Sequence, residues 1–118
     1  IADVVGLPGI HQEVKSMAWS CGDTALCFLH ELMKDIGGLT MNTDIIEQIE
    51  KDLKDSGFTI ITMCEHFFEK QGYTGLWLLA ESHFAIHSFP EEDKIYIELS
   101  SCVDEPFFEM MQRLENYN

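Results

Sequence analysis

Apolar residues recur at helical spacing in two stretches of the chain. Between about residues 43 and 56, an apolar stripe repeats every three or four positions, while acids and lysines fill the other side. Asn42 or Thr43 can cap the start of this helix. A second helix is predicted at about residues 105–116, with Pro106 in its first turn. The apolar side chains expected to face the core are Ile45, Ile49, Leu53, Phe107 and Met111, together with Phe108 and Leu114.

Extended segments are predicted before and between these helices. Residues 58–63 are rich in β-branched and aromatic side chains, residues 75–80 form a continuous apolar run, and residues 94–102 alternate. Residues 25–32 also favour a strand, although their apolar spacing fits a short helix as well. Residues 83–89 continue the preceding strand in extended form as far as a proline.

The order strand, helix, strand, strand, strand, helix indicates an α+β fold. We expect a two-layer sandwich in which a mainly antiparallel, four-stranded sheet is covered on one face by the two helices. Gly6, Pro8 and Gly9 interrupt any regular element near the N-terminus. Residues 1–20 are therefore expected to form an extension outside the fold, and residues 21–118 a single domain.

The second face of the predicted sheet needs a cover. Trp77 and Leu79 lie on the same strand, and a sheet face that carries such side chains is not expected to remain in water. Small domains also gain stability by association. We therefore expect a partner chain on this face, with a homodimer as the predicted assembly.

Charge and hydropathy limit the kinds of molecule that the protein is expected to bind. The 118-residue chain carries 21 acidic and 7 basic residues, a formal net charge of −14. Nucleic acids are disfavoured because their binding depends on lysines and arginines that neutralise phosphates, whereas an acidic field attracts cations. The longest apolar run, residues 76–80, is far shorter than the ~20 residues that span a bilayer, and no secretory signal is recognisable. The expected location is the cytoplasm, without membrane contact.

Histidine spacing gives weak evidence for a metal site. His83 and His87 are four residues apart, which places them on one face of a strand, with Cys64 or Glu65 as a candidate further ligand. The sequence contains no HExxH, CxxC or GxSxG motif. A metal centre is therefore not predicted, and a serine hydrolase is disfavoured.

The most informative stretch is residues 72–102, GYTGLWLLAESHFAIHSFPEEDKIYIELSSC. Its motif consists of Glu81-Ser82-His83, His87 five residues after the serine, Pro90-Glu91, and Cys102 twenty residues after the serine. An upstream His66-x-Phe68 precedes a glycine turn. Together these features resemble the self-processing region of the prokaryotic S-adenosylmethionine decarboxylases, most clearly over residues 57–102.

The resemblance implies an α+β sandwich and autocatalytic cleavage between Glu81 and Ser82. In that family the serine attacks the preceding carbonyl, and elimination then leaves a pyruvoyl group at the new N-terminus. This group accepts electrons during decarboxylation, which no ordinary side chain can do. By matching position, Ser82 would be the source of the pyruvoyl cofactor, and His87 the processing acid or base. Cys102 would donate a proton to the decarboxylated carbon.

The resemblance also assigns supporting residues. Thr74 stands where the family has a serine that assists processing, and Phe68 and Glu91 would contact the substrate, Phe68 by stacking on adenine. One geometric difficulty follows from the spacing, since strand alternation places residues five apart on opposite faces. We therefore expect a β-bulge near Ser82 that lets His87 reach it.

The implied function is decarboxylation of S-adenosylmethionine, which supplies aminopropyl groups for spermidine and other polyamines. Two alternatives remain open. One is a non-catalytic dimerisation domain of the kind appended to aminopropyltransferases. The other is a pyruvoyl decarboxylase that acts on ornithine or arginine, because departures from the family pattern at Ala85, Phe89 and Lys70 lie near the site.

Overall fold

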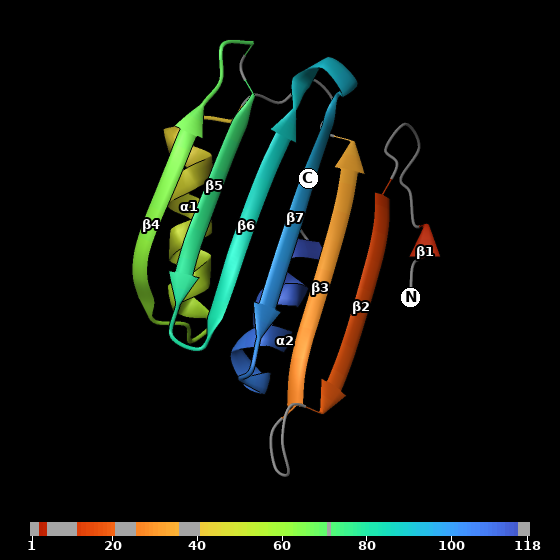
Figure 1. Ribbon diagram of the computed structural model, residues 1–118, viewed down its shortest axis with the longest axis vertical. Coiled ribbons are helices and arrows are strands. Elements are labelled where there is room, and N and C mark those ends of the chain that lie inside the picture. The colour runs from red at the N-terminus through yellow and green to blue at the C-terminus, as the bar shows by residue number, and fades with distance from the viewer. Residues whose placement is uncertain (1–2, 5–11, 21–25, 36–40, 71, 116–118) are drawn as a thin grey trace.

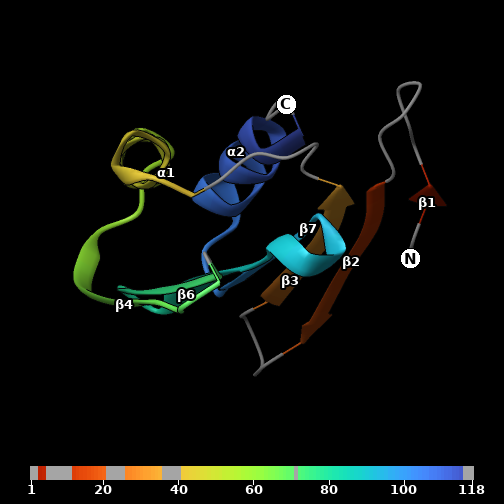
Figure 2. The same cartoon turned by 90° about the horizontal axis from the view of Figure 1, so that it is seen from above.

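The computed structural model describes residues 3–4, 12–20, 26–35, 41–70 and 72–115. These residues form two layers, an antiparallel sheet and two helices on one of its faces (Figures 1 and 2). The strands are β1 (Asp3–Val4), β2 (Gln12–Ser20), β3 (Leu26–Asp35), β4 (Ile60–Phe67), β5 (Tyr73–Leu79), β6 (Ser82–Phe89) and β7 (Lys94–Ser101). The helices are α1 (Thr43–Asp55), α2 (Asp104–Glu115) and the short 3-10 helix η1 (Pro90–Glu92).

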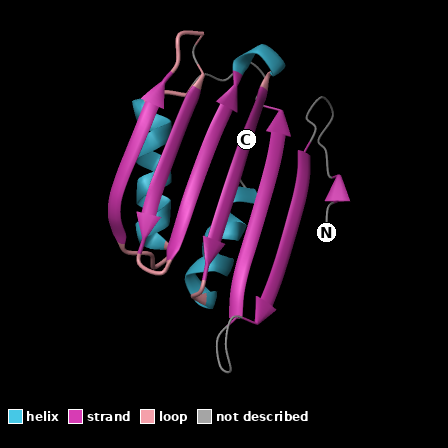
Figure 3. Cartoon of the chain, in the orientation of Figure 1, coloured by secondary structure: helices cyan, strands magenta, loops and turns pink. Residues whose placement is uncertain are grey.

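The strand order in the sheet is β1-β2-β3-β7-β6-β5-β4, and all neighbouring strands are antiparallel (Figure 3). The predicted α+β sandwich with two helices on one face is confirmed. The number of strands is larger than expected, since the described residues form seven strands instead of four. One reason is that residues 83–89, expected to continue the preceding strand, belong to the separate strand β6, which turns back along β5.

The described part of the expected N-terminal extension also belongs to the sheet. β2 pairs with β3 along its whole length, from Gln12 opposite Lys34 to Ser20 opposite Leu26. The expectation of an arm outside the fold is therefore wrong for residues 12–20. The glycines and proline that motivated it all precede this strand. The described residues 3–4 and 12–20 therefore belong to the sheet of the predicted domain of residues 21–118, and the outer bounds of that domain stay a prediction.

Both helices form where the spacing predicts them. The side chain of Asn42 caps α1 by accepting a hydrogen bond from the backbone N–H of Ile45 at 3.0 Å. Ile49, Leu53 and Phe107 are buried as expected, whereas Ile45 and Met111 are only partly buried. Phe108 is exposed, because it lies one position beyond the buried stripe of α2, which consists of Phe107, Met110 and Leu114. Neither helix in the described ranges is long and apolar enough to cross a membrane.

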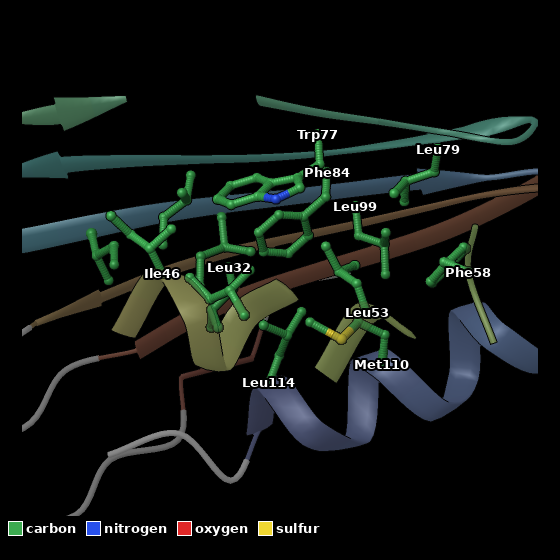
Figure 4. Close-up of a cluster of buried hydrophobic side chains, with 14 of the residues drawn as sticks. Leu32, Ile46, Leu53, Phe58, Trp77, Leu79, Phe84, Leu99, Met110 and Leu114 are labelled. Atoms are coloured by element: carbon green, nitrogen blue, oxygen red, sulfur yellow. The ribbon is translucent and has the colours of Figure 1, made fainter. Parts of the chain in front are cut away.

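The core lies between the sheet and the helices (Figure 4). On β5, the side chains of Trp77 and Leu79 point into this core, and the Trp77 indole donates a hydrogen bond to Glu50 of α1 at 3.1 Å. The prediction that these two residues lie on the uncovered face is therefore wrong. Because side chains alternate along a strand, the helix-free face instead carries Leu76 and Leu78, which are 44% and 50% exposed.

Candidate active site

The expected cleavage site lies at the turn between β5 and β6. Leu79, the last residue of β5, pairs with Ser82, the first residue of β6, so only Ala80 and Glu81 connect the two strands. Glu81 has a φ of 61°, in the left-handed region that residues other than glycine rarely occupy. Holding a residue there costs on the order of 1–2 kcal/mol. The turn therefore strains the residue whose carbonyl would be attacked.

Pairing of β6 with β7 brings Cys102 to this turn. Ser82 lies opposite Ser101, and the backbone N–H of Cys102 donates to the carbonyl oxygen of Glu81 at 3.2 Å. The Ser82 hydroxyl donates to the hydroxyl of Ser101 at 2.9 Å. The thiol of Cys102 is free, and its Sγ lies 3.0 Å from the Sγ of Cys27 on β3. We call Glu81, Ser82, Ser101 and Cys102 the turn cluster.

Ser101 is a member of this cluster that the sequence reading missed. Its side chain is only 2% exposed and faces the Ser82 hydroxyl. The sequence does contain a signal for it. A hairpin closed around η1 pairs Phe89 with Lys94, and counting outward along both strands pairs Ser82 with the residue directly before Cys102.

A second group of expected site residues surrounds His87 on the helix-free face. Thr74 of β5 pairs with His87 of β6, and the Thr74 Oγ1 lies 2.9 Å from the His87 Nδ1. The ring of Tyr96 stacks near His87, with centroids 6.0 Å apart. A hydroxyl in hydrogen-bond contact with an imidazole is an arrangement suited to proton transfer. We call Thr74, His87 and Tyr96 the histidine cluster.

The hydroxyl of Tyr96 is engaged by a carboxylate outside this cluster. This hydroxyl donates to Glu31 of β3 at 2.8 Å. Burial, followed by this hydrogen bond to a carboxylate, raises the pKa of Tyr96 well above its ordinary value. The phenol therefore remains protonated near neutral pH and does not serve as a base.

The residues expected to contact substrate lie at the same end of the sheet as the histidine cluster. Phe68 follows β4, and its ring centroid is 4.5 Å from that of His66. Glu91 lies in η1, and the side chains of Phe68 and Glu91 are both exposed. Figure 1 shows the β4–β5 connection and η1 at one end of the sheet and the β5–β6 turn at the other. Within one chain, Phe68 and Glu91 are therefore remote from Ser82.

A single chain does not bring His87 to Ser82. β6 pairs with β7 without a register shift from Ser82 to Phe89, and its pairing with β5 is equally regular. The bulge expected near Ser82 is therefore not formed, and that prediction is wrong. Five residues of regular strand separate the two positions by roughly 17 Å and place their side chains on opposite faces.

His83 and His87, the two histidines considered as metal ligands, are not arranged to bind a metal ion together. His83 and His87 do share the helix-free face, but the His83 Nε2 lies 3.3 Å from Glu98, and His87 contacts Thr74. Glu65 accepts a hydrogen bond from Tyr73 at 2.6 Å. Across the described ranges, no group of three or more His, Cys, Asp or Glu side chains is placed to hold a metal ion.

Comparison with known sequences relates most of the chain to one family. The family model described as S-adenosylmethionine decarboxylase matches residues 31–116. An S-adenosylmethionine decarboxylase proenzyme of Prochlorococcus marinus is 44% identical over 52 residues, which are 44% of this chain and 42% of that protein. A proenzyme of the same description from Clostridium botulinum is 37% identical over 62 residues, 52% of this chain and 53% of the relative. The chain thus spans about half, or less, of the length of these curated relatives.

A solved structure has a similar fold. The crystal structure of the adenosylmethionine decarboxylase from Aquifex aeolicus matches with a TM-score of 0.61 at 29% sequence identity. The match covers 76% of this chain and 78% of the other. The two-layer arrangement described above is therefore shared with a protein of that description.

Proposed function

This chain belongs to the S-adenosylmethionine decarboxylase family, and we propose that it is a self-cleaving precursor whose product decarboxylates S-adenosylmethionine. The family match, residues 31–116, includes both the turn cluster and the histidine cluster. One observation carries the proposal. The carbonyl of Glu81 accepts the N–H of Cys102 directly beside the hydroxyl of Ser82. Self-cleavage needs a carbonyl and a nucleophile in this relation.

Cleavage would begin with attack of the Ser82 oxygen on the carbonyl carbon of Glu81. The hydroxyl proton passes to a base, and negative charge develops on the carbonyl oxygen that the Cys102 N–H contacts. A hydrogen-bond donor aimed at such an oxygen stabilises the transition state. Breaking the C–N bond then frees the amine of Ser82 and leaves an ester between the two residues. Opening this peptide also releases the left-handed strain at Glu81.

Elimination would complete the cleavage. A base removes the Cα proton of Ser82, the Cβ–Oγ bond breaks, and Glu81 departs with the new C-terminal carboxylate. The remaining enamine takes up water and releases ammonia, which converts residue 82 into a pyruvoyl group. Once in place, this group supplies the electron sink that decarboxylation requires. Ser82, at the start of β6 and next to a strained turn, fits the requirements for its source.

The base for these steps is proposed to come from a second copy of the chain. None of the hydrogen bonds described around the turn reaches an imidazole. His87 has the required chemistry, but in its own chain it lies roughly 17 Å from Ser82 along a regular strand. It projects from the helix-free face, where another sheet can be placed against it.

A face-to-face homodimer solves this problem with one symmetry axis. A two-fold axis that lies between two sheets and runs across the strands reverses the direction of β6 in the second copy. If the axis passes over β6 between Phe84 and Ala85, the backbone at Ser82 comes opposite the partner's His87, and the reverse arrangement forms at the same time. Facing sheets pack about 10 Å apart, a distance that side chains bridge. Each active site would then combine one turn cluster with the partner's histidine cluster.

The helix-free face has the composition that such an interface requires. Leu76 and Leu78 are exposed on the same face of β5, two positions apart, and Trp19 of β2 is 43% exposed. Large apolar side chains exposed on an otherwise uncovered sheet face favour an interaction surface there. Ala85, at the proposed axis, has a side chain small enough for a second strand to approach closely. A second copy is the partner that offers the same apolar surface in return.

S-adenosylmethionine is the substrate that the remaining residues favour. In the proposed dimer, Phe68 and Glu91 would lie near the turn cluster of the partner. The exposed ring of Phe68 can stack on adenine, and the carboxylate of Glu91 can accept hydrogen bonds from ribose hydroxyls. The net charge of −14 raises the local concentration of a cationic sulfonium. The product would supply aminopropyl groups for spermidine.

Replacement of Cys102 should separate cleavage from catalysis. In Cys102→Ala the backbone N–H that contacts Glu81 remains, so we expect cleavage to proceed within a few-fold of the wild-type rate. The thiol that would protonate the substrate carbon is lost, and turnover should fall by about 10²–10⁴-fold. Cleavage is measured by intact mass and turnover by release of labelled carbon dioxide. Cys64→Ala, which removes the exposed free thiol of β4, is the control. Unchanged turnover in Cys102→Ala would leave Cys102 with a packing role only.

Substrate choice can be tested at Phe68. The cleaved protein should release carbon dioxide from S-adenosylmethionine, and Phe68→Ala should raise the Michaelis constant several-fold, in keeping with about 0.5–1.5 kcal/mol for an aromatic contact. Phe67→Ala is a matched control, because Phe67 is equally exposed at 53% but packs on Tyr73. Release from ornithine or arginine alone would contradict this substrate and leave the pyruvoyl mechanism in place.

A further inference from the structure

Three hydrogen bonds meet at the hydroxyl of Ser101, the last residue of β7. The backbone N–H of Val103 donates to the Ser101 Oγ at 3.0 Å, and the Ser101 Oγ donates to the carbonyl oxygen of Val103 at 2.8 Å. The third bond joins this oxygen to the hydroxyl of Ser82 at 2.9 Å. A hydroxyl has one proton and two acceptor lone pairs. Because its proton is directed to Val103, Ser101 can only accept the bond from Ser82.

We propose that Ser101 is a positioning residue for self-cleavage, which directs the Ser82 hydroxyl by accepting its hydrogen bond. This inference rests on the self-cleavage proposed above. With its proton directed toward Ser101, the Ser82 oxygen keeps its lone pairs available for the carbonyl carbon of Glu81. Ser101 is not the base, because its lone pairs belong to a neutral hydroxyl whose own proton is held by a carbonyl. Its effect is on the direction of the nucleophile.

The sheet holds Ser101 in the way that such a role requires. Ser101 is 2% exposed and has a paired neighbour on each side, Phe28 of β3 and Ser82 of β6. Its two bonds to Val103 leave its side chain little freedom to rotate. Without Ser101 as its acceptor, the Ser82 side chain could occupy any of three staggered rotamers. Two of these rotamers would point the Ser82 oxygen in another direction.

Two consecutive residues thus hold both reacting groups. Ser101 contacts the nucleophile through its side chain, while Cys102 contacts the carbonyl through its backbone N–H. The end of β7 therefore fixes the nucleophile relative to the carbonyl before any base arrives. Misplacement of a reacting atom by about 1 Å costs on the order of 100-fold in rate, so loss of the Ser101 hydroxyl should be visible in the cleavage rate.

The test compares Ser101→Thr with Ser101→Val in the full-length protein. The two side chains have nearly the same shape, and only threonine keeps a hydroxyl. We expect Ser101→Thr to cleave within a few-fold of wild type and Ser101→Val to cleave 10- to 100-fold more slowly. Intact mass gives the rate, and circular dichroism establishes that both variants are folded. Ser101→Ala should behave like Ser101→Val.

Hydroxylamine identifies the affected step. This nucleophile splits an accumulated ester but leaves a peptide bond intact. If Ser101 directs the attack, most Ser101→Val chains remain full length with and without hydroxylamine at the time when wild type is largely cleaved, because ester formation itself is slowed. Splitting by hydroxylamine at the wild-type extent would overturn the proposal, since the attack would then be normal and the defect later. Equal cleavage rates in Ser101→Thr and Ser101→Val would overturn it as well, while cleavage itself would stand. Absence of cleavage in wild type would instead contradict the proposed function, and the inference with it.

Discussion

Wild-type protein should convert into two fragments, residues 1–81 and 82–118, whereas Ser82→Ala should remain a single chain. Removal of the hydroxyl removes the only atom of Ser82 that can attack the Glu81 carbonyl, so the expected effect is complete loss of cleavage. The fold should survive, because Ser82 lies at the start of a strand and is only half-buried. Intact mass of freshly purified protein, followed over time, measures the conversion, and the fragment from residue 82 should carry the mass of a pyruvoyl terminus.

Ser88→Ala provides the matched control for this experiment. Ser88 lies on the same strand and the same face as Ser82, and its buried hydroxyl has no hydrogen-bond partner within the described structure. Its removal should leave cleavage unchanged. If the wild-type chain stays full length after long incubation and hydroxylamine does not split it, self-cleavage is contradicted. The dimerisation domain of an aminopropyltransferase would then become the leading interpretation.

The motif named Glu81, Ser82 and Cys102 of the turn cluster, but the turn itself and Ser101 were missed, because residues 83–89 were expected to continue the preceding strand. The geometry that joins them is nevertheless local. A strand that ends at Leu79, a two-residue turn and a strand that begins at Ser82 place the proposed cleavage site in a tight turn. The next hairpin, closed by η1, returns the chain so that Cys102 arrives beside Glu81. The numbers of residues in two consecutive hairpins determine both the tight turn at Glu81 and the position of Cys102 beside it. These numbers can be counted in the sequence once the turns are known.

The relation between His87 and Ser82 was not predictable in the same way. The expected bulge rested on the assumption that one chain must complete the site, and the regular pairing of β6 removes that assumption. The sheet face on which each β5 side chain lies also depended on the register of the strand. A continuous apolar run gives no alternation, so the sequence did not reveal that Trp77 faces the helices while Leu78 faces outward. The β2–β3 pairing involves contacts that no local motif marks.

Co-expression of Ser82→Ala and His87→Ala chains should restore cleavage that neither variant shows alone. In a mixed dimer, one site contains both substitutions and is inactive. The other site combines the intact Ser82 of the His87→Ala chain with the intact His87 of its partner. With random assembly about half of the dimers are mixed, so about half of the His87→Ala chains should be cut and none of the Ser82→Ala chains. Intact mass distinguishes the two, because the fragment from residue 82 carries alanine at position 87.

The same two substitutions placed in one chain give the matched control. When the double variant Ser82→Ala/His87→Ala is co-expressed with wild type, both sites of a mixed dimer lack one group. Only wild-type chains in wild-type dimers are then cleaved, so the cut fraction of wild-type chains should fall to about half. A site completed within one chain makes the opposite pair of predictions: no cleavage in the first mixture and complete cleavage of wild-type chains in the second. The two mixtures thus decide whether the roughly 17 Å between His87 and Ser82 is bridged by a second copy.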